Sequence, residues 1–355
     1  MIAKSCPQRR RLTLALGALA VGGAAAKPCL ASGRLAVDDA GRQVALSSTP
    51  QRVFPAGAPA AVFLYCLAPD RLLGWPRALR GDEAAWLLPR VRALPELGRL
   101  SGRGSTARLE GLLAMRADLV IDVGSVTPTY VSLVDQVQRQ TGVPCLLFDG
   151  SLHRTQGTLE RLGEVLGVQA RARDLAEGVR RILDEMAGLR ARLGEGDRPR
   201  VYFARGPSGL VTAGPGTLSG ELIEEVGAVN VAVTPAPNLA QVSLEQVIGW
   251  QPDWIVATDP AFVDGLARHP VWSRLPAVRA GRVALVPRVP FGWFDAPPAL
   301  NRFAGLVWLS ATLHPEGRRG PLDETMVDLF EWLYHHRPSN AAMRELLASA
   351  RMRDR

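Results

Sequence analysis

Arginines and aromatic residues are the side chains of this sequence whose spacing suggests chemistry. The string Gly-Arg-Gly-Ser-Thr at 102–106 stands just before an expected helix, where backbone N–H groups, hydroxyls and a guanidinium can converge on an anion. It is not a phosphate-binding loop, because no Gly-Lys-Ser/Thr follows, and it lacks the third glycine of a dinucleotide fingerprint. One interpretation is an anion-binding loop built on Arg103, Ser105 and Thr106. The other is that Ser105 or Thr106 caps the helix and Arg103 is solvated.

A second cluster of arginine and aromatic residues follows the expected strand that ends at Val286. The cluster comprises Arg288, Phe291, Trp293 and Phe294, with several prolines among them. Such a loop directly after a strand suits a stiff wall against a large apolar or chelating ligand. The alternative is that Trp293 and Phe294 only pack the edge of a lobe. We expect binding, because aromatic residues this dense are typical of contact surfaces.

Four more side chains lie in segments that we expect to reach the same cleft: Trp75, Arg77, Tyr130 and Arg205. In parallel α/β sheets, ligands collect beyond the carboxyl ends of the strands. Tyr130 and also Tyr65 are candidate phenolate ligands for iron, provided that the metal stabilises an anion that otherwise forms near pH ~10. The surplus of arginine over acidic residues in these loops favours a ligand with negative charge.

The sequence carries no motif of enzymatic chemistry and no motif of a bare metal site. It has no Gly-x-Ser-x-Gly motif, no Ser, His and Asp at the spacing of a catalytic triad and no paired carboxylates in a cleft loop. Its five histidines lack an HxxE or CxxC context, which disfavours a receptor for zinc or manganese ions. We therefore expect a binding protein that is not an enzyme and has no resident cofactor. An exported enzyme is the rival class.

The elements that must position these residues are strands alternating with helices. Short apolar runs bounded by Gly, Pro or Asp have the pattern of buried parallel strands, at 119–123, 145–148, 201–203, 254–257 and 283–286. Helical patterns lie between them, which implies βαβ units and parallel sheets. The predicted fold class is α/β. Because 355 residues exceed one usual core, we expect two lobes.

A short internal sequence repeat indicates that the two lobes are similar. The pair Leu-Glu stands at 109–110 and again at 244–245, and in both halves an Asp follows eight residues after the Glu. Each Glu opens an expected helix and each Asp leads into an expected strand. A further parallel is that Arg52 and Arg282 each introduce an apolar strand. A duplicated α/β lobe is the interpretation.

A long amphipathic helix is expected between the lobes. From Arg171 to Leu193, apolar residues recur at helical spacing over about 35 Å, which predicts a rigid strut and not a flexible hinge. The expected organisation is a signal peptide at 1–31, an N-terminal α/β lobe at 32–152, a linking helical segment at 153–196, a C-terminal α/β lobe at 197–312 and a C-terminal helical tail at 313–355.

The first residues have the pattern of a targeting segment. Lys4 and the arginines at 9–11 precede an uncharged run, 12–26, that is too short to span a bilayer. We expect a cleaved signal peptide, cut near 26 or near 31, and a periplasmic location; an uncleaved anchor is the alternative. Without this segment the net charge falls from +8 to about +4, and the dispersed arginines do not suggest nucleic-acid binding. Whether Cys66 and Cys145 form a disulfide is left open by their spacing.

Taken in order, these features resemble the iron-complex binding proteins of ABC importers. The string 35–44 followed by Pro-Gln-Arg-Val at 50–53 looks like the N-terminal pattern of that family, and Arg-Leu-Glu at 108–110 resembles its Asn-Leu-Glu helix start with arginine in place of asparagine. The string 243–247, Pro-Asp at 252–253 and the long helix complete a match over nearly the whole mature chain. The resemblance implies two Rossmann-like lobes joined by a single long backbone helix.

The resemblance also implies a function. The protein would be the periplasmic substrate-binding component of an ABC importer that captures a ferric siderophore or a haem-like anionic chelate between its lobes. Receptors for cobalamin and for oxyanions share the family, so these ligands remain alternatives. The implied partner is the ABC permease dimer in the inner membrane, and we expect the binding protein itself to be a monomer. In the family one glutamate of each lobe pairs with permease arginines, and the matching residues are Glu110 and Glu245; alternatively, each Glu only complements its own helix dipole.

Overall fold

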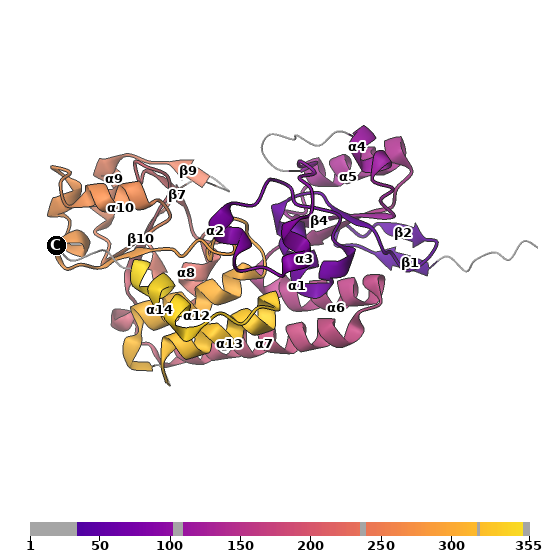
Figure 1. The fold of residues 1–355 in the computed structure, drawn as a ribbon. Coiled ribbons are helices and arrows are strands. Elements are labelled where there is room, and N and C mark those ends of the chain that lie inside the picture. Colours follow the sequence, from indigo (N-terminus) through magenta and orange to yellow (C-terminus); the bar gives the residue numbers. More distant parts are fainter. Residues whose placement is uncertain (1–33, 102–108, 235–238, 318–319, 351–355) are drawn as a thin grey trace, which may run out of the picture.

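Two parallel sheets, side by side above one long helix, organise the chain (Figure 1). The computed structural model describes residues 34–101, 109–234, 239–317 and 320–350. All five strands expected from the sequence are present, and the α/β class with two lobes and a backbone helix is confirmed. Within these ranges no helix is both long and apolar enough to cross a membrane.

The first lobe is built on a three-stranded parallel sheet in the order β3–β4–β5. Strand β3 is buried along its whole length, as expected of a parallel strand covered on both faces. An antiparallel hairpin, β1–β2, precedes the sheet. The elements are β1 (Arg34–Val37), β2 (Gln43–Leu46), β3 (Val53–Pro55), β4 (Leu119–Gly124), β5 (Cys145–Asp149), α1 (Ala58–Leu67), α2 (Gly81–Ala84), α3 (Pro89–Arg92), α4 (Leu109–Ala114) and α5 (Pro128–Thr141).

The second lobe is built on a four-stranded parallel sheet in the order β11–β10–β6–β8. The same lobe contains a small antiparallel pair, β7–β9. Strand β7 follows β6 in the sequence after a short turn. The elements are β6 (Arg200–Ala204), β7 (Val211–Ala213), β8 (Val229–Asn230), β9 (Leu239–Gln241), β10 (Trp254–Ala257), β11 (Val283–Leu285), α8 (Glu221–Glu225), α9 (Leu244–Trp250), α10 (Pro260–Leu266) and α11 (Pro276–Arg279).

The link between the lobes is a helical pair, α6 (Thr155–Leu166) and α7 (Gln169–Arg192). Helix α7 has 24 residues and is therefore about 36 Å long. It runs beneath both sheets (Figure 1). Its buried face includes Leu175, Val179, Ile182 and Met186, which recur every three or four residues as the sequence pattern predicted.

Three C-terminal helices bind the lobes together: α12 (Asn301–Leu313), α13 (Leu322–Tyr334) and α14 (Asn340–Ser349). The Tyr65 hydroxyl of α1 donates a hydrogen bond to the backbone carbonyl of Tyr334 at the end of α13. One hydrophobic core contains side chains of α1, α7, α12 and α13, whereas each lobe also has a separate core of its own. The C-terminal helices are thus part of the shared core beneath the lobes.

The two sheets repeat each other strand for strand. In the first lobe the outer neighbour of β3 is Leu72, through a parallel bridge to Val53; in the second lobe the outer neighbour of β6 is β8. The orders Leu72–β3–β4–β5 and β8–β6–β10–β11 therefore correspond. This correspondence corrects one prediction: Arg282 introduces β11, the counterpart of β5, so it is not equivalent to Arg52.

The true counterpart of Arg52 is Arg200, and the two make the same contacts. The Arg52 Nη2 atom donates to the carbonyl of Met115 at 2.7 Å, at the end of α4, and its backbone N–H donates to Asp118. The Arg200 Nη2 atom donates to the carbonyl of Trp250 at 2.7 Å, at the end of α9, and its backbone N–H donates to Asp253 at 2.8 Å. In each lobe the arginine and the aspartate thus fasten a short helix to the first strand of the parallel sheet, β3 or β6. We call this unit the helix clamp.

Cys66 and Cys145 are both free and buried, so they form no disulfide. Cys66 belongs to the shared core and Cys145 to the core of the first lobe. Burial raises the pKa of each thiol to about 12, which keeps both protonated at neutral pH.

Candidate ligand site

A cavity of about 440 Å³ opens between the lobes, at the carboxyl ends of the strands. Arg205 follows β6, Thr258 follows β10 and Arg288 follows β11, so three of the four strands of the second-lobe sheet deliver one wall. The first lobe contributes the start of α1 and the segment 75–83. The cleft that strand order predicts is therefore where the structure has its cavity.

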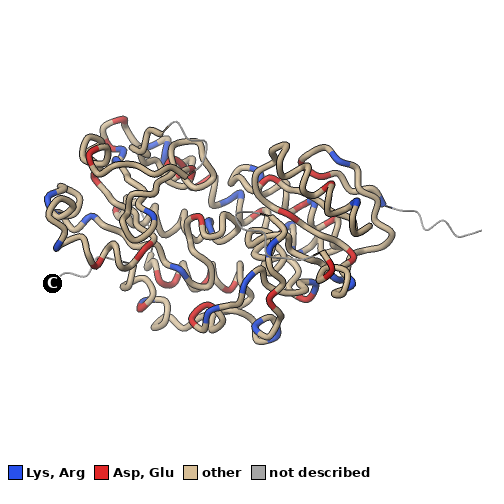
Figure 2. Tube along the Cα trace, turned by 90° about the horizontal axis from the view of Figure 1, so that it is seen from above, with Lys and Arg blue, Asp and Glu red and all other residues tan. Residues whose placement is uncertain are grey.

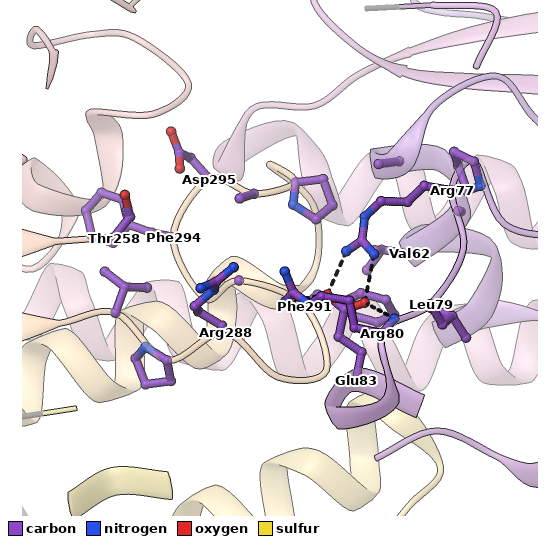
Figure 3. Close-up of a pocket in the computed structure, with 18 of the residues that line it drawn as sticks. Val62, Arg77, Leu79, Arg80, Glu83, Thr258, Arg288, Phe291, Phe294 and Asp295 are labelled. Atoms are coloured by element: carbon purple, nitrogen blue, oxygen red, sulfur yellow. Dashed lines mark hydrogen bonds and ion pairs between the residues drawn. The ribbon is translucent and has the colours of Figure 1, made fainter. Parts of the chain in front are cut away.

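The first-lobe wall carries two arginines held by one buried carboxylate. The Glu83 side chain is only 2 % exposed and accepts two hydrogen bonds from Arg77, at 2.6 and 2.8 Å. It also pairs with Arg80 at 2.6 Å (Figure 3). Because a bidentate pair fixes the plane of a guanidinium, Glu83 orients Arg77 at the cavity wall.

The second-lobe wall carries one arginine beside a buried acid. The Arg205 Nε atom lies 3.2 Å from an oxygen of Asp295, whose side chain is nearly inaccessible. Burial raises the pKa of Asp295, and Arg205 opposes that shift. The Ser219 hydroxyl donates a hydrogen bond to this carboxylate and, like Arg205, opposes the rise of its pKa. Asp295 therefore lines the cavity as a buried acid that Arg205 and Ser219 hold in place.

Arg288 differs from the other three cavity arginines. It is exposed, and within the described part of the chain no hydrogen bond or ion pair joins it to another residue. Figure 3 shows it on the second-lobe side of the cavity, with the Arg77, Arg80 and Glu83 group on the other side. Its guanidinium is consequently available to an anion that enters the cavity.

Aromatic side chains form the apolar part of the cavity wall. Phe291 packs against Trp75 across the two lobes, with ring centroids 5.9 Å apart. Phe294 stacks on Phe203 of β6 at 4.4 Å. The Trp75 indole donates to the carbonyl of Val91 at 2.8 Å, so its ring is fixed before any ligand arrives.

The aromatic loop after β11 is held by its own hydrogen bonds. The Trp293 indole donates to the carbonyl of Val289 at 2.9 Å, and the backbone N–H of Trp293 donates to the carbonyl of Pro287 at 3.0 Å. Helix α12 approaches the loop at Gly305, where a Cβ would lie 1.8 Å from the Trp293 carbonyl oxygen. Only glycine fits there, so the loop is locked against α12.

Six of the predicted ligand-binding residues line the cavity, namely Trp75, Arg77, Arg205, Arg288, Phe291 and Phe294. Arg103, Ser105 and Thr106 lie outside the described residues. Arg80, Glu83 and Asp295 also line the cavity and were missed. The spacing of Arg77, Arg80 and Glu83, three residues apart each time, was the available signal.

Three aromatic residues named as ligand candidates from the sequence lie outside the cavity lining. Trp293 is fully buried and packs against Trp308 and Phe330 in the shared core, so it is not part of the wall. Tyr130 packs on the core of the first lobe and does not line the cavity. Tyr65 is buried within α1 and hydrogen-bonded at its hydroxyl, and burial raises its pKa far above the ordinary value. Neither tyrosine is placed to bind iron in this cavity.

Acidic and histidine side chains do not gather into a metal site. No group of three or more His, Cys, Asp or Glu side chains in the described ranges is arranged to hold a metal ion. Arginines are interspersed with acidic residues over both lobes (Figure 2). The cavity wall carries four arginines and three acids, Glu83, Asp259 and Asp295, so its formal charge is positive by one.

Glu110 and Glu245 are exposed at the second residue of α4 and of α9. Figure 1 shows both helices on the side of the molecule opposite α7, one on each lobe. Neither glutamate lines the cavity. The Ser243 hydroxyl accepts from the Gln246 N–H and so caps α9. The exposed Glu245 carboxylate also hydrogen-bonds its own backbone N–H and the Ser243 side chain, which lowers its pKa.

A family model described as periplasmic binding protein matches residues 89–290 of the chain, more than half of its length. The chain belongs to this family. It is accordingly the substrate-binding component of an ABC importer, a solute-binding protein and not an enzyme, and works with an inner-membrane permease. What it carries in the cleft is cargo, not a cofactor.

Relatives of the chain differ in the ligand that their names give. The molybdate-binding protein MolA of Haemophilus influenzae is 27 % identical over 285 residues, which cover 71 % of this chain and 78 % of that protein. A cobalamin-binding protein of Halobacterium salinarum is 29 % identical over 164 residues, 44 % of this chain and 41 % of its own length. Among solved structures, an ABC transporter solute-binding protein of Sulfurospirillum deleyianum superposes with a TM-score of 0.80 at 25 % identity, covering 88 % of this chain and 98 % of its own.

Proposed function

We propose that this binding protein captures an anionic metal chelate, a ferric siderophore or a haem-like complex, between its two lobes. The unpartnered Arg288, opposite the Arg77–Glu83 pair, is the observation that carries the proposal. An acidic group of the ligand would bind Arg288 and Arg77 from opposite walls. Its organic part would lie on Phe291 and Trp75, which supply the apolar surface.

The size of the cavity favours a chelate over a bare ion. Its volume, about 440 Å³, lies within the range of sites for drug-sized molecules. An ion of five heavy atoms would fill a small part of that space and would leave the aromatic wall without a role. A chelate uses both the arginines and the rings.

Molybdate is the second candidate ligand, and one observation favours it. The relative whose name specifies molybdate matches this chain over most of both sequences. A tetrahedral oxyanion would be held by the same arginines, with water filling the rest of the cavity.

Isothermal titration of the purified mature protein with a panel of ligands tests the proposal. The panel contains ferric siderophores of the catecholate and hydroxamate classes, haemin, cyanocobalamin, molybdate and tungstate, with sulfate as a control anion. We expect one-to-one binding of an iron chelate and weak or no binding of molybdate. Tight binding of molybdate or cobalamin alone would replace the iron chelate as the cargo.

The proposal extends to export and docking. Residues 1–31 would be removed on export to the periplasm, and Glu110 and Glu245 would pair with basic residues of the permease dimer. The docking role of the two glutamates is supported by their equivalent positions in the two lobes. Each is the second residue of a helix fixed by a helix clamp, and both helices lie on the same side of the molecule. A pair of equivalent carboxylates suits a two-fold symmetric partner.

A further inference from the structure

Two exposed apolar side chains occupy the same position in the two lobes. Leu113 of α4 is 49 % exposed and Ile248 of α9 is 40 % exposed. Only six large hydrophobic side chains in the described ranges are comparably exposed, so the equivalence of two of them calls for an explanation. Each stands three residues after the glutamate of its helix, and residues three apart share one helix face.

The backbone that presents these side chains is also the same in both lobes. One residue before each of them, Leu112 and Val247 are fully buried and anchor their helices to the lobe cores. Three residues after them, Arg116 and Gln251 adopt left-handed conformations with φ of 48° and 45°. Residues other than glycine seldom adopt such angles, so this shared feature is a specific property of the repeat.

We infer that Leu113 and Ile248 are apolar anchors for the permease, so that each lobe docks through a glutamate and a hydrophobic side chain one helical turn apart. The inference rests on the proposed docking of Glu110 and Glu245 and adds a second kind of contact to it. The partner surface would be a basic residue beside an apolar depression, presented twice by the two-fold symmetric dimer. Desolvation of the apolar anchor would strengthen the neighbouring ion pair, which on an open surface contributes little.

Scattered exposed hydrophobic residues are common on protein surfaces and need no partner. Leu35 and Val37 of β1 are exposed in this way, and they have no counterpart in the second lobe because the hairpin β1–β2 is not repeated. Leu113 and Ile248 differ because the duplicated fold retains an apolar residue at the solvent-facing position of both copies. Val37, which is 52 % exposed, is therefore a matched control.

The test uses the full mature protein and its cognate permease–ATPase complex in lipid nanodiscs. Leu113→Ser, Ile248→Ser, the double variant and the control Val37→Ser are compared with wild type by biolayer interferometry. We expect each single change to weaken binding about fivefold and the double change about 25-fold, since the two contacts are separate. Val37→Ser should bind like wild type, and all variants should keep the wild-type circular dichroism spectrum and ligand affinity.

The double variant binding as tightly as wild type would overturn the inference, and so would an equal loss in Val37→Ser. Parallel measurement of Glu110→Arg with Glu245→Arg separates this inference from the docking proposal. If the charge-reversed protein loses binding but the Leu113→Ser, Ile248→Ser double variant does not, only the apolar anchors are rejected. No loss in either double variant rejects docking through these helices altogether.

Discussion

The guanidinium of Arg302 is completely buried and forms an ion pair with Glu221. Arg302 is the second residue of α12 and Glu221 is the first residue of α8, yet Arg302 also donates to the carbonyl of Gly150 in the first lobe. Glu221 in turn accepts from the backbone N–H of Leu152. The pair therefore holds the lobes to each other as well as α12 to α8.

Removing the acid from this pair should destabilise the protein strongly. Glu221→Ala would leave a buried cation with only carbonyl partners, and we expect a loss of about 3 kcal/mol in the free energy of unfolding. Urea denaturation followed by circular dichroism measures it. The double variant Glu221→Ala with Arg302→Met removes both charges and should recover part of the loss. A single variant as stable as wild type would mean that the pair does not contribute.

Ligand binding should change the shape of the molecule only slightly. Helix α7 spans both lobes, the shared core includes α1, α12 and α13, and Arg302 bridges the lobes beside the cleft. Rotation of one lobe against the other would have to break these contacts. Small-angle scattering profiles with and without ligand should nearly coincide. A marked compaction would point to a flexible hinge.

Arg288 should contribute directly to ligand affinity. Arg288→Ala removes a charge-assisted contact worth about 1.5 to 3 kcal/mol, so the dissociation constant should rise about tenfold or more. Arg268→Ala is the matched control, because Arg268 is an exposed arginine of the second lobe that does not line the cavity. Titration calorimetry compares the two. Equal affinities would remove Arg288 from the site.

Asp122 should make stability depend on pH. It is buried in β4, it accepts hydrogen bonds from Ser101 and Val123, and burial raises its pKa from 3.8 to about 6. Between pH 3.8 and about 6, Asp122 is ionised in the unfolded chain but keeps its proton in the folded protein. The free energy of unfolding therefore falls by about 3 kcal/mol as the pH rises through this range, and the contribution of Asp122 does not change further at higher pH.

The variant Asp122→Asn isolates this effect. The free energy of unfolding of wild type minus that of Asp122→Asn should fall as pH rises from 4 to 7, measured by urea denaturation at each pH. Ser101 and Val123 can still donate to the amide oxygen of asparagine. Parallel pH profiles for the two proteins would show that Asp122 is not titrating in this range.

Charge reversal at the docking glutamates should separate transport from binding. Glu110→Arg with Glu245→Arg leaves the cavity untouched, so ligand affinity should stay at the wild-type value while uptake through the importer collapses. Uptake of radiolabelled ligand into proteoliposomes, together with calorimetry, measures both. Persistent uptake by the folded double variant would reduce the glutamates to helix-start residues.

Periodicity and repetition made the fold predictable, because buried strands and the face of α7 carry regular patterns of apolar residues. The cavity was predictable where residues follow strands, as Arg205 and Arg288 do. Glu83 was missed because the segment 76–88 contains only the single-turn helix α2, and the three-residue spacing of Arg77, Arg80 and Glu83 does not by itself say which side chains point inward. The same reason hid the burial of Trp293. Tyr65 could have been assigned to the core, because α1 is apolar on all sides.

The contact between Tyr65 and Tyr334 joins residues that are 269 positions apart. Helix α1 is almost wholly buried, and α13 is one of the helices that cover it. The first lobe therefore cannot finish folding until nearly the entire chain has been synthesised. Until then α1 presents its hydrophobic surface to chaperones and proteases, and a polypeptide that ends before α13 never conceals it. Only chains that include the last helices can therefore bury α1. Contacts of such long range also make folding slow.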